Sequence, residues 1–287
     1  AKFFIVMQIP KQLEKIAPRY QEVLSLVEPY IFCFPDSLAQ FDLAPWGIEI
    51  PVENQISCVK QGNAIFFDLL HRLDGLAFGP MGMPMEKWVF FDCGEMPGGI
   101  FGFGVRSDQL SANAKKEFQV PDGYQGLVPI SMYIAIPMVK PGCWFGHNLS
   151  SLNWALDKKL SGLGILTKAL ALMTMKIEQM YGATQWDSKA LHIHLQLADM
   201  EIASAYTPAH TFANSMTYLS NYSSAGLLTA LSGVSREAKE WDFLYPADDE
   251  NFSIKIQQRI EQQERMALVG RPQQVDGKTV YPVRSFS

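Results

Sequence analysis

The segment between Ile56 and Met138 constrains the fold most strongly. It contains four short runs rich in β-branched and aromatic residues, AIFFDLL, KWVFFDC, IFGFGV and VPISMYIAIPM. Such runs favour strands, and the Gly/Pro clusters at 79–84 and 95–99 separate them as turns do. The closely spaced glycines of residues 94–104 indicate bent or bulged strands. The segment therefore predicts a curved, mainly antiparallel sheet.

Two helical patterns flank this segment. Gln8 to Tyr30 carries apolar residues at intervals of three and four, with Pro18 placed to interrupt the helix or start a turn. Leu163 to Tyr181 is rich in Leu, Ala, Met and Lys, and Gly182 stands where a helix stop belongs. The apolar residues of this second helix cover most of its circumference, which predicts a buried helix.

The rest of the chain gives weaker signals. Residues 190–197 alternate between apolar and polar, so they and residues 201–205 predict a hairpin. Beyond Ser223 the composition becomes more polar. We expect one α+β domain over 1–287, with a helical and irregular part at 1–55 and a polar C-terminal extension at 224–287.

Composition excludes several classes of protein. Of 287 residues, 48% are hydrophobic and 18% charged, which is enough apolar material for a core. The net charge of −5 predicts no nucleic-acid partner, and no apolar run is long enough to span a bilayer. The opening FFIVM is too short for a secretory signal, and the four cysteines are widely scattered. We therefore expect reduced thiols and a cytoplasmic location.

Histidines give one candidate site. The sequence has no phosphate-binding P-loop, nucleophile elbow or zincin motif. His192 and His194 would share one strand face, and His210 follows sixteen residues later, so the three could hold a metal. The alternative interpretation is a polar strand face in contact with water.

Carboxylates and lysine amines give two more candidate sites. Asp92 and Glu95 follow an aromatic run, where burial raises the pKa of a carboxyl and suits it to acid–base catalysis; they could equally cap a turn. An amine acts as a nucleophile only when burial or a nearby cation lowers its pKa. Lys158 and Lys159 could provide that cation for each other, whereas Lys168 has the most apolar surroundings. The alternative for all three is a solvated side chain.

The order of several motifs resembles the acetoacetate decarboxylase family. VPISMYIAIP, GHNLSS and DKKLSGLG follow one another as the family's Met-Tyr strand, Gly-Arg-Glu-Leu-Ser segment and Lys-Lys-Leu-Gly segment do. His147 and Asn148 replace the Arg-Glu pair. Without a gap, Trp154 and Ala155 would stand where the family has its two lysines.

The resemblance implies a fold and an activity. The fold would be a sheet closed into a cone or barrel around a cavity, with flanking helices. The activity would be a lyase reaction, decarboxylation of a small keto acid through a lysine Schiff base, with no metal or organic cofactor. Lys158, Lys159 and Glu95 would be catalytic. The residues expected to bind substrate are His147, Asn148, Tyr133, Asp92, Trp154 and Lys168.

Two alternatives remain open. The same cavity could belong to a non-catalytic protein that binds an apolar or acidic small molecule, or the three histidines could serve a metal-dependent enzyme. The apolar surplus of the sequence also predicts a homo-oligomer.

Overall fold

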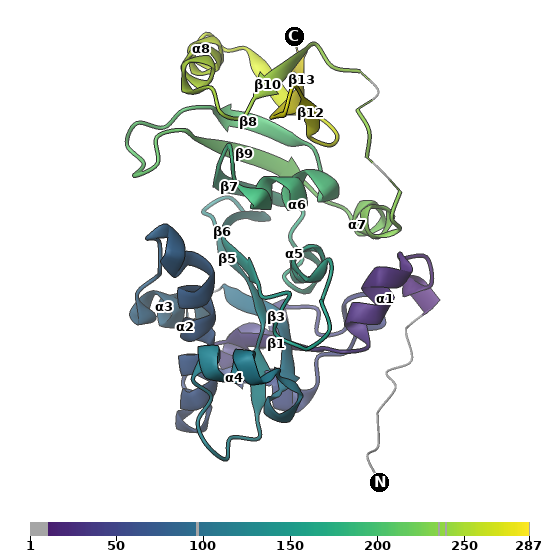
Figure 1. Ribbon diagram of the computed structural model, residues 1–287, viewed down its shortest axis with the longest axis vertical. Helices are drawn as coiled ribbons and strands as arrows, with labels where there is room; N and C mark the ends of the chain where they lie inside the picture. Colours follow the sequence, from purple (N-terminus) through teal and green to yellow (C-terminus); the bar gives the residue numbers. More distant parts are fainter. Residues whose placement is uncertain (1–10, 96–97, 235, 239, 287) are drawn as a thin grey trace. The chain divides into compact units, whose positions relative to one another are not determined.

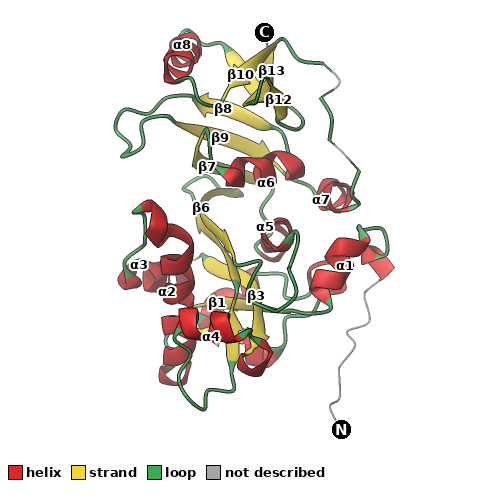
Figure 2. Cartoon of the chain, in the orientation of Figure 1, coloured by secondary structure: helices red, strands yellow, loops and turns green. Residues whose placement is uncertain are grey.

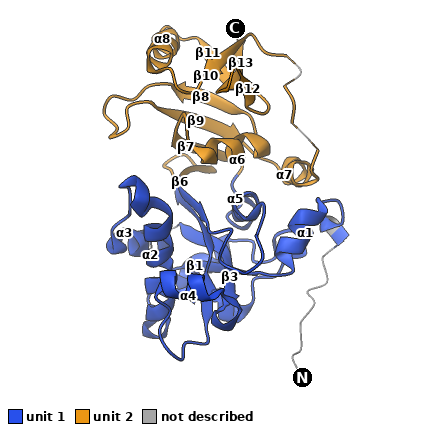
Figure 3. Cartoon of the chain, in the orientation of Figure 1, with its two compact units in different colours: residues 1–137, 147–177 blue, residues 138–146, 178–287 orange. Residues whose placement is uncertain are grey.

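The computed structural model describes residues 11–95, 98–234, 236–238 and 240–286, and it divides the chain into two compact units. Unit 1 contains the described residues up to 137 together with 147–177, and unit 2 contains 138–146 and the described residues from 178 (Figure 3). Helices and strands occur in both units (Figures 1 and 2), which makes this an α+β protein as predicted. Within the described residues no helix is long and apolar enough to cross a membrane.

The strands of unit 1 follow the order β6–β5–β3–β1–β2, and β4 pairs with β3. Only the second half of β6 belongs to this unit. All pairings for which the register is defined here are antiparallel except β1 with β2. The strands are β1 (Glu28–Cys33), β2 (Gln55–Ser57), β3 (Gly99–Arg106), β4 (Leu127–Pro129), β5 (Ser131–Pro137) and β6 (Cys143–Ser151).

The helices of unit 1 supply most of the residues considered below. They are α1 (Pro18–Leu24), α2 (Ala64–Phe78), α3 (Lys87–Glu95), α4 (Ala112–Phe118) and α5 (Leu163–Thr174). Short 3₁₀ segments lie between them: η1 (Lys11–Leu13), η2 (Pro35–Gln40), η3 (Pro45–Gly47), η4 (Val52–Asn54), η5 (Gln61–Asn63), η6 (Gly79–Met81) and η7 (Ser107–Gln109).

Unit 2 holds the remaining strands in the order β10–β13–β11–β8–β9–β7–β6, and β12 pairs with β13. The first half of β6 runs parallel to β7, and the pairs from β7 to β10 are antiparallel. Its elements are β7 (Gln179–Gln185), α6 (Lys189–Leu197), β8 (Met200–Ser204), β9 (Ser215–Asn221), α7 (Ser224–Leu231), β10 (Phe243–Pro246), α8 (Glu250–Glu261), β11 (Arg265–Leu268), β12 (Gln273–Val275) and β13 (Lys278–Phe286).

The sheet is open, which corrects the predicted cone or barrel. Among the described strands of unit 1, β2 has β1 as its only partner, and in unit 2 β10 has only β13. In neither unit do the outermost strands pair with each other, so nothing closes the sheet. The prediction that it is mainly antiparallel is confirmed.

Two of the four predicted strand runs are helices. AIFFDLL lies in α2, where Phe66, Leu69 and Leu73 are buried at helical spacing. KWVFFDC lies in α3. The third run is β3, as expected, but its glycine at 102 serves close packing: a Cβ there would lie 2.0 Å from the Ser131 carbonyl oxygen, so only glycine fits.

The predicted helices are shorter than expected. Residues 8–10 lie outside the described residues, and the first pattern gives α1, which Pro18 starts rather than interrupts, followed by β1. The second gives α5, whose chain enters through Gly162 at φ +89°, where a Cβ would meet the ring of Tyr20 at 2.4 Å. Lys176, at φ 54°, turns the chain out of the helix toward β7.

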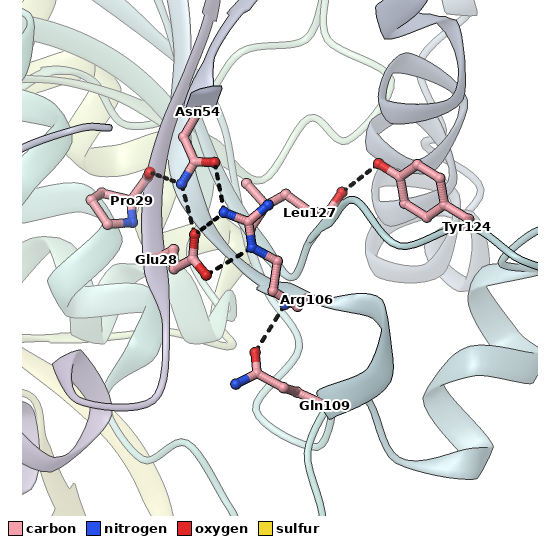
Figure 4. A network of polar contacts seen from close by, with 7 residues as sticks. All are labelled: Glu28, Pro29, Asn54, Arg106, Gln109, Tyr124 and Leu127. Atoms are coloured by element: carbon pink, nitrogen blue, oxygen red, sulfur yellow. Dashed lines mark hydrogen bonds and ion pairs between the residues drawn. The ribbon is translucent and has the colours of Figure 1, made fainter. Parts of the chain in front are cut away.

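A polar network ties η4 to the start of β1 and the end of β3 (Figure 4). Arg106 of β3 donates from Nε and Nη2 to the two carboxylate oxygens of Glu28 on β1, at 2.9 and 2.5 Å. Asn54, which is fully buried, donates to Glu28 at 3.0 Å and to the Pro29 carbonyl at 3.2 Å. The network satisfies the buried amide of Asn54 and fixes η4 beside the two strands.

Candidate functional site

A pocket of about 300 Å³ opens between α2, the start of α3 and the C-terminal end of α4. From α2 come Ile65, Asp68, Leu69 and Arg72, which stand at i, i+3, i+4 and i+7 and so share one helix face. The other lining residues are His71, Lys87, Phe118, Gln119 and Pro121. Cations and apolar walls thus meet in one small cavity.

Arg72 is the most constrained cation of the pocket. Its Nε donates a 2.8 Å hydrogen bond to the carbonyl of Glu117, in the last turn of α4. Neither Nη1 nor Nη2 has a hydrogen-bond partner within the part of the chain that the structure describes. The backbone contact therefore fixes the guanidinium plane and leaves its two terminal nitrogens for a ligand.

Lys87 and Asp68 form an ion pair at the pocket rim, where both side chains are at least half exposed. The Lys87 ammonium also lies 5.2 Å from the centroid of the Phe67 ring. With His71 neutral, the lining residues carry two positive charges and one negative charge, so the pocket has a net charge of +1.

Behind the pocket, a buried carboxyl holds the segment that precedes α3. Asp74, fully buried on α2, accepts a 2.7 Å hydrogen bond from the Met85 amide and a 3.0 Å bond from Asn148 Nδ2 on β6. His71, one turn earlier on α2, contacts the carbonyl of the same Met85 through Nε2 at 2.8 Å. The histidine ring also packs edge-on against Phe90, with centroids 5.6 Å apart.

Burial is the main influence on the Asp74 carboxyl. It raises the pKa of Asp74 above its usual value, because the charged form loses its hydration. The hydrogen bonds from Met85 and Asn148, and the nearby His71 and His147, act in the opposite direction but do not cancel the effect. Asp74 is therefore a carboxyl poised to take up a proton more readily than an exposed one.

The structure separates the predicted lysines from the predicted carboxylates. Lys158 is exposed and forms an ion pair with Glu22, and Lys159 is exposed beside it. Glu95, exposed, ends α3, while Asp92 is half-buried one turn earlier. No hydrogen bond or ion pair between described residues joins either lysine to either carboxylate.

The remaining predicted residues fall into three places. His147 and Asn148 contact each other at 2.9 Å, and Asn148 reaches Asp74. Lys168 and Tyr133 are both buried, with the Lys168 Nζ 5.8 Å from the centroid of the Tyr133 ring. Burial lowers the pKa of Lys168 well below its usual value. Trp154 remains 42% exposed.

The predicted histidine metal site does not form. Residues 190–197 lie in the helix α6, which Ser188 caps by accepting from the Ala190 amide, and not in a strand. His192 and His194, two apart on a helix, point to different sides: His192 is exposed and His194 is buried against Tyr218. Among the described residues no three His, Cys, Asp or Glu side chains are grouped to hold a metal.

Comparisons with known proteins identify no family. No family model matches the chain, and no curated protein matches its sequence. One solved structure with a partial likeness is the ribosomal-protein-S18-alanine N-acetyltransferase from Escherichia coli, at 11% identity and a TM-score of 0.36. The likeness covers 57% of this chain and 89% of that one. At that score it carries no argument about fold or function.

These findings correct the resemblance to acetoacetate decarboxylase. No family model matches, the sheet is open, and the strand expected at 190–197 is a helix. With no matching family model or curated protein, a lyase or decarboxylase finds no support. The residues that sequence reasoning missed are His71, Arg72, Asp74 and Lys87. The signal for the first three was the helical spacing of AIFFDLLHRLDGLAF, which extends beyond the run interpreted as a strand; Lys87 begins the other run interpreted as a strand.

Proposed function

We propose that the protein binds a small organic anion in the pocket between α2, α3 and α4. The observation that carries this proposal is Arg72, whose Nε is held by the Glu117 carbonyl while its two Nη atoms have no hydrogen-bond partner among the described residues. A guanidinium fixed in this way presents two parallel donors, the arrangement that matches the two oxygens of a carboxylate.

The size and walls of the pocket support the same conclusion. About 300 Å³ is at the lower end of small-molecule sites, which favours a ligand of metabolite size. Ile65, Leu69, Phe118 and Pro121 provide apolar contacts for the ligand's body. The charge of +1 favours a monoanion, and Lys87 at the rim would attract it from solution.

Binding of 3-methylbutanoate, measured by isothermal titration calorimetry, tests the proposal. Replacing Arg72 with Gln removes a charge-assisted pair of hydrogen bonds, so we expect affinity to fall roughly 10- to 100-fold. Arg72→Lys keeps the positive charge but loses the two parallel donors of the guanidinium. Its affinity should therefore lie between those of the unsubstituted protein and Arg72→Gln. Arg284→Gln, an exposed site in unit 2, is the matched control and should bind as the unsubstituted protein does. Equal binding by Arg72→Gln would refute the proposed site.

A further inference from the structure

His71, one of the residues that line the pocket, carries a defined hydrogen-bond acceptor. Its Nε2 lies 2.8 Å from the Met85 carbonyl oxygen, which can only accept, so Nε2 carries the proton. In the neutral imidazole the other nitrogen, Nδ1, then holds a lone pair and no proton. Nδ1 has no hydrogen-bond partner within the described ranges, and His71 lines the pocket.

We infer that the ligand is a hydroxycarboxylic acid with an apolar body, an inference that rests on the proposed anion site. Its hydroxyl donates a hydrogen bond to His71 Nδ1, and its carboxylate accepts hydrogen bonds from Arg72. The two residues are neighbours on α2, and both line the cavity. One ligand can therefore contact both if its donor lies close to its carboxylate, as in a 2- or 3-hydroxy acid.

Charge separates the hydroxy acid from an amino acid, which would also offer a donor. The Asp68 carboxylate, which could receive an ammonium group, is already paired with Lys87. A hydroxy acid of charge −1 balances the pocket's +1, whereas an amino acid of net charge zero leaves it unbalanced. The pocket thus selects a neutral donor beside a single carboxylate.

A matched set of four probes tests this inference by calorimetry at about pH 8, above the titration range of ordinary imidazole. The set consists of 3-methylbutanoate, its 2-hydroxy and 2-methoxy derivatives, and valine. We expect the 2-hydroxy acid to bind roughly 3- to 10-fold more tightly than the parent acid, the gain of one hydrogen bond. The methoxy compound, which cannot donate, should show no gain, and valine should bind more weakly than the parent.

His71→Phe provides the second arm, because it retains a ring against Phe90 and removes the acceptor. The preference for the hydroxy acid should fall to about one, while the parent acid still binds. Arg284→Gln, in unit 2 and outside the pocket, should leave the preference unchanged. A gain shared by the methoxy compound, or a preference that survives His71→Phe, overturns the inference and leaves the anion site standing. Failure of the parent acid to bind, or its indifference to Arg72→Gln, instead removes the proposed function.

Discussion

Asn148 on β6 donates a 3.0 Å hydrogen bond to Asp74 on α2, a residue 74 positions earlier in the chain. Its second amide proton points to the Met85 sulfur at 3.1 Å. One side chain of a strand thereby holds both the buried carboxyl and the segment before α3 behind the candidate pocket. This arrangement leads to the first two predictions.

Asp74 should make the protein less stable as pH rises. Its folded pKa is raised, so between the unfolded value of about 3.9 and the folded value the native state holds a proton that the unfolded chain has lost. The stability from this group is complete below the lower value and is lost as pH rises through the higher one. Urea unfolding from pH 3 to 7 should show the native protein losing stability relative to Asp74→Asn. Parallel curves for the two proteins would contradict the assignment.

Substitution of Asn148 should destabilise the protein, because it removes a hydrogen-bond donor from the Asp74 carboxyl. Asn148→Ala removes a hydrogen bond to a charged group, for an expected loss of about 1.5–3 kcal/mol in the free energy of unfolding. Asn148→Asp should cost more at pH 7, because it places a second carboxylate against Asp74, and should recover at pH 4 as protonation provides a donor. Lys159→Ala, an exposed substitution elsewhere in unit 1, is the control and should change stability by less than about 0.5 kcal/mol. A loss as large in the control would show that the effect is not specific to Asp74.

The buried Lys168 amine should destabilise the folded protein at neutral pH. Burial lowers its folded pKa, so the unfolded chain binds the extra proton and stability rises with pH up to the unfolded value of about 10.4. Lys168→Met keeps the length of the side chain without the amine and should stabilise the protein at pH 7. The gain should shrink toward pH 10. Exposed Lys159→Met is the control, expected to be neutral at every pH; a destabilised Lys168→Met would count against this account.

Asn54 should be essential to the network in Figure 4. Its loss leaves the buried Pro29 carbonyl without its amide donor and removes one of the donors to Glu28, so Asn54→Ala should cost about 1–3 kcal/mol in thermal or urea unfolding. Asn54→Asp should be worse, because it sets a carboxylate beside Glu28. Gln109→Ala removes only an exposed contact to the Arg106 amide and serves as the mild comparison. If Asn54→Ala lost no more stability than Gln109→Ala, the network would contribute little to the stability of the fold.

The sequence predicted the parts of the fold that local composition determines. α5 was recognisable because Leu163 to Thr174 is apolar nearly throughout, and β5 because its β-branched run is bounded by Pro129 and Pro137. α2 was not, because its Phe and Ile residues have strand propensity and packing against β4 and α4 overrides it. The alternation of residues 190–197 likewise satisfied a strand pattern, yet Ser188 caps a helix there.

The candidate site was largely hidden for the same reason. With α2 read as a strand that stopped at Leu70, the helix turn that brings His71, Arg72 and Asp74 together could not be seen. Asn148 was selected, through the motif around it, but its partner Asp74 lies in a segment far away in sequence. Lys158 and Lys159 drew attention as an adjacent pair, and nothing local revealed that Glu22 would neutralise the first.

The division of β6 between the two units affects the order in which its partners are synthesised and the fragments into which the chain can be cleaved. The polypeptide enters unit 2 at residue 138, returns to unit 1 at 147, and enters unit 2 again at 178. During synthesis, residues 143–146 emerge before α5 and meet their partner β7 only afterwards. A fragment starting at residue 178 would carry β7 with a bare parallel edge, a template for aggregation, so no single cut yields two self-sufficient halves.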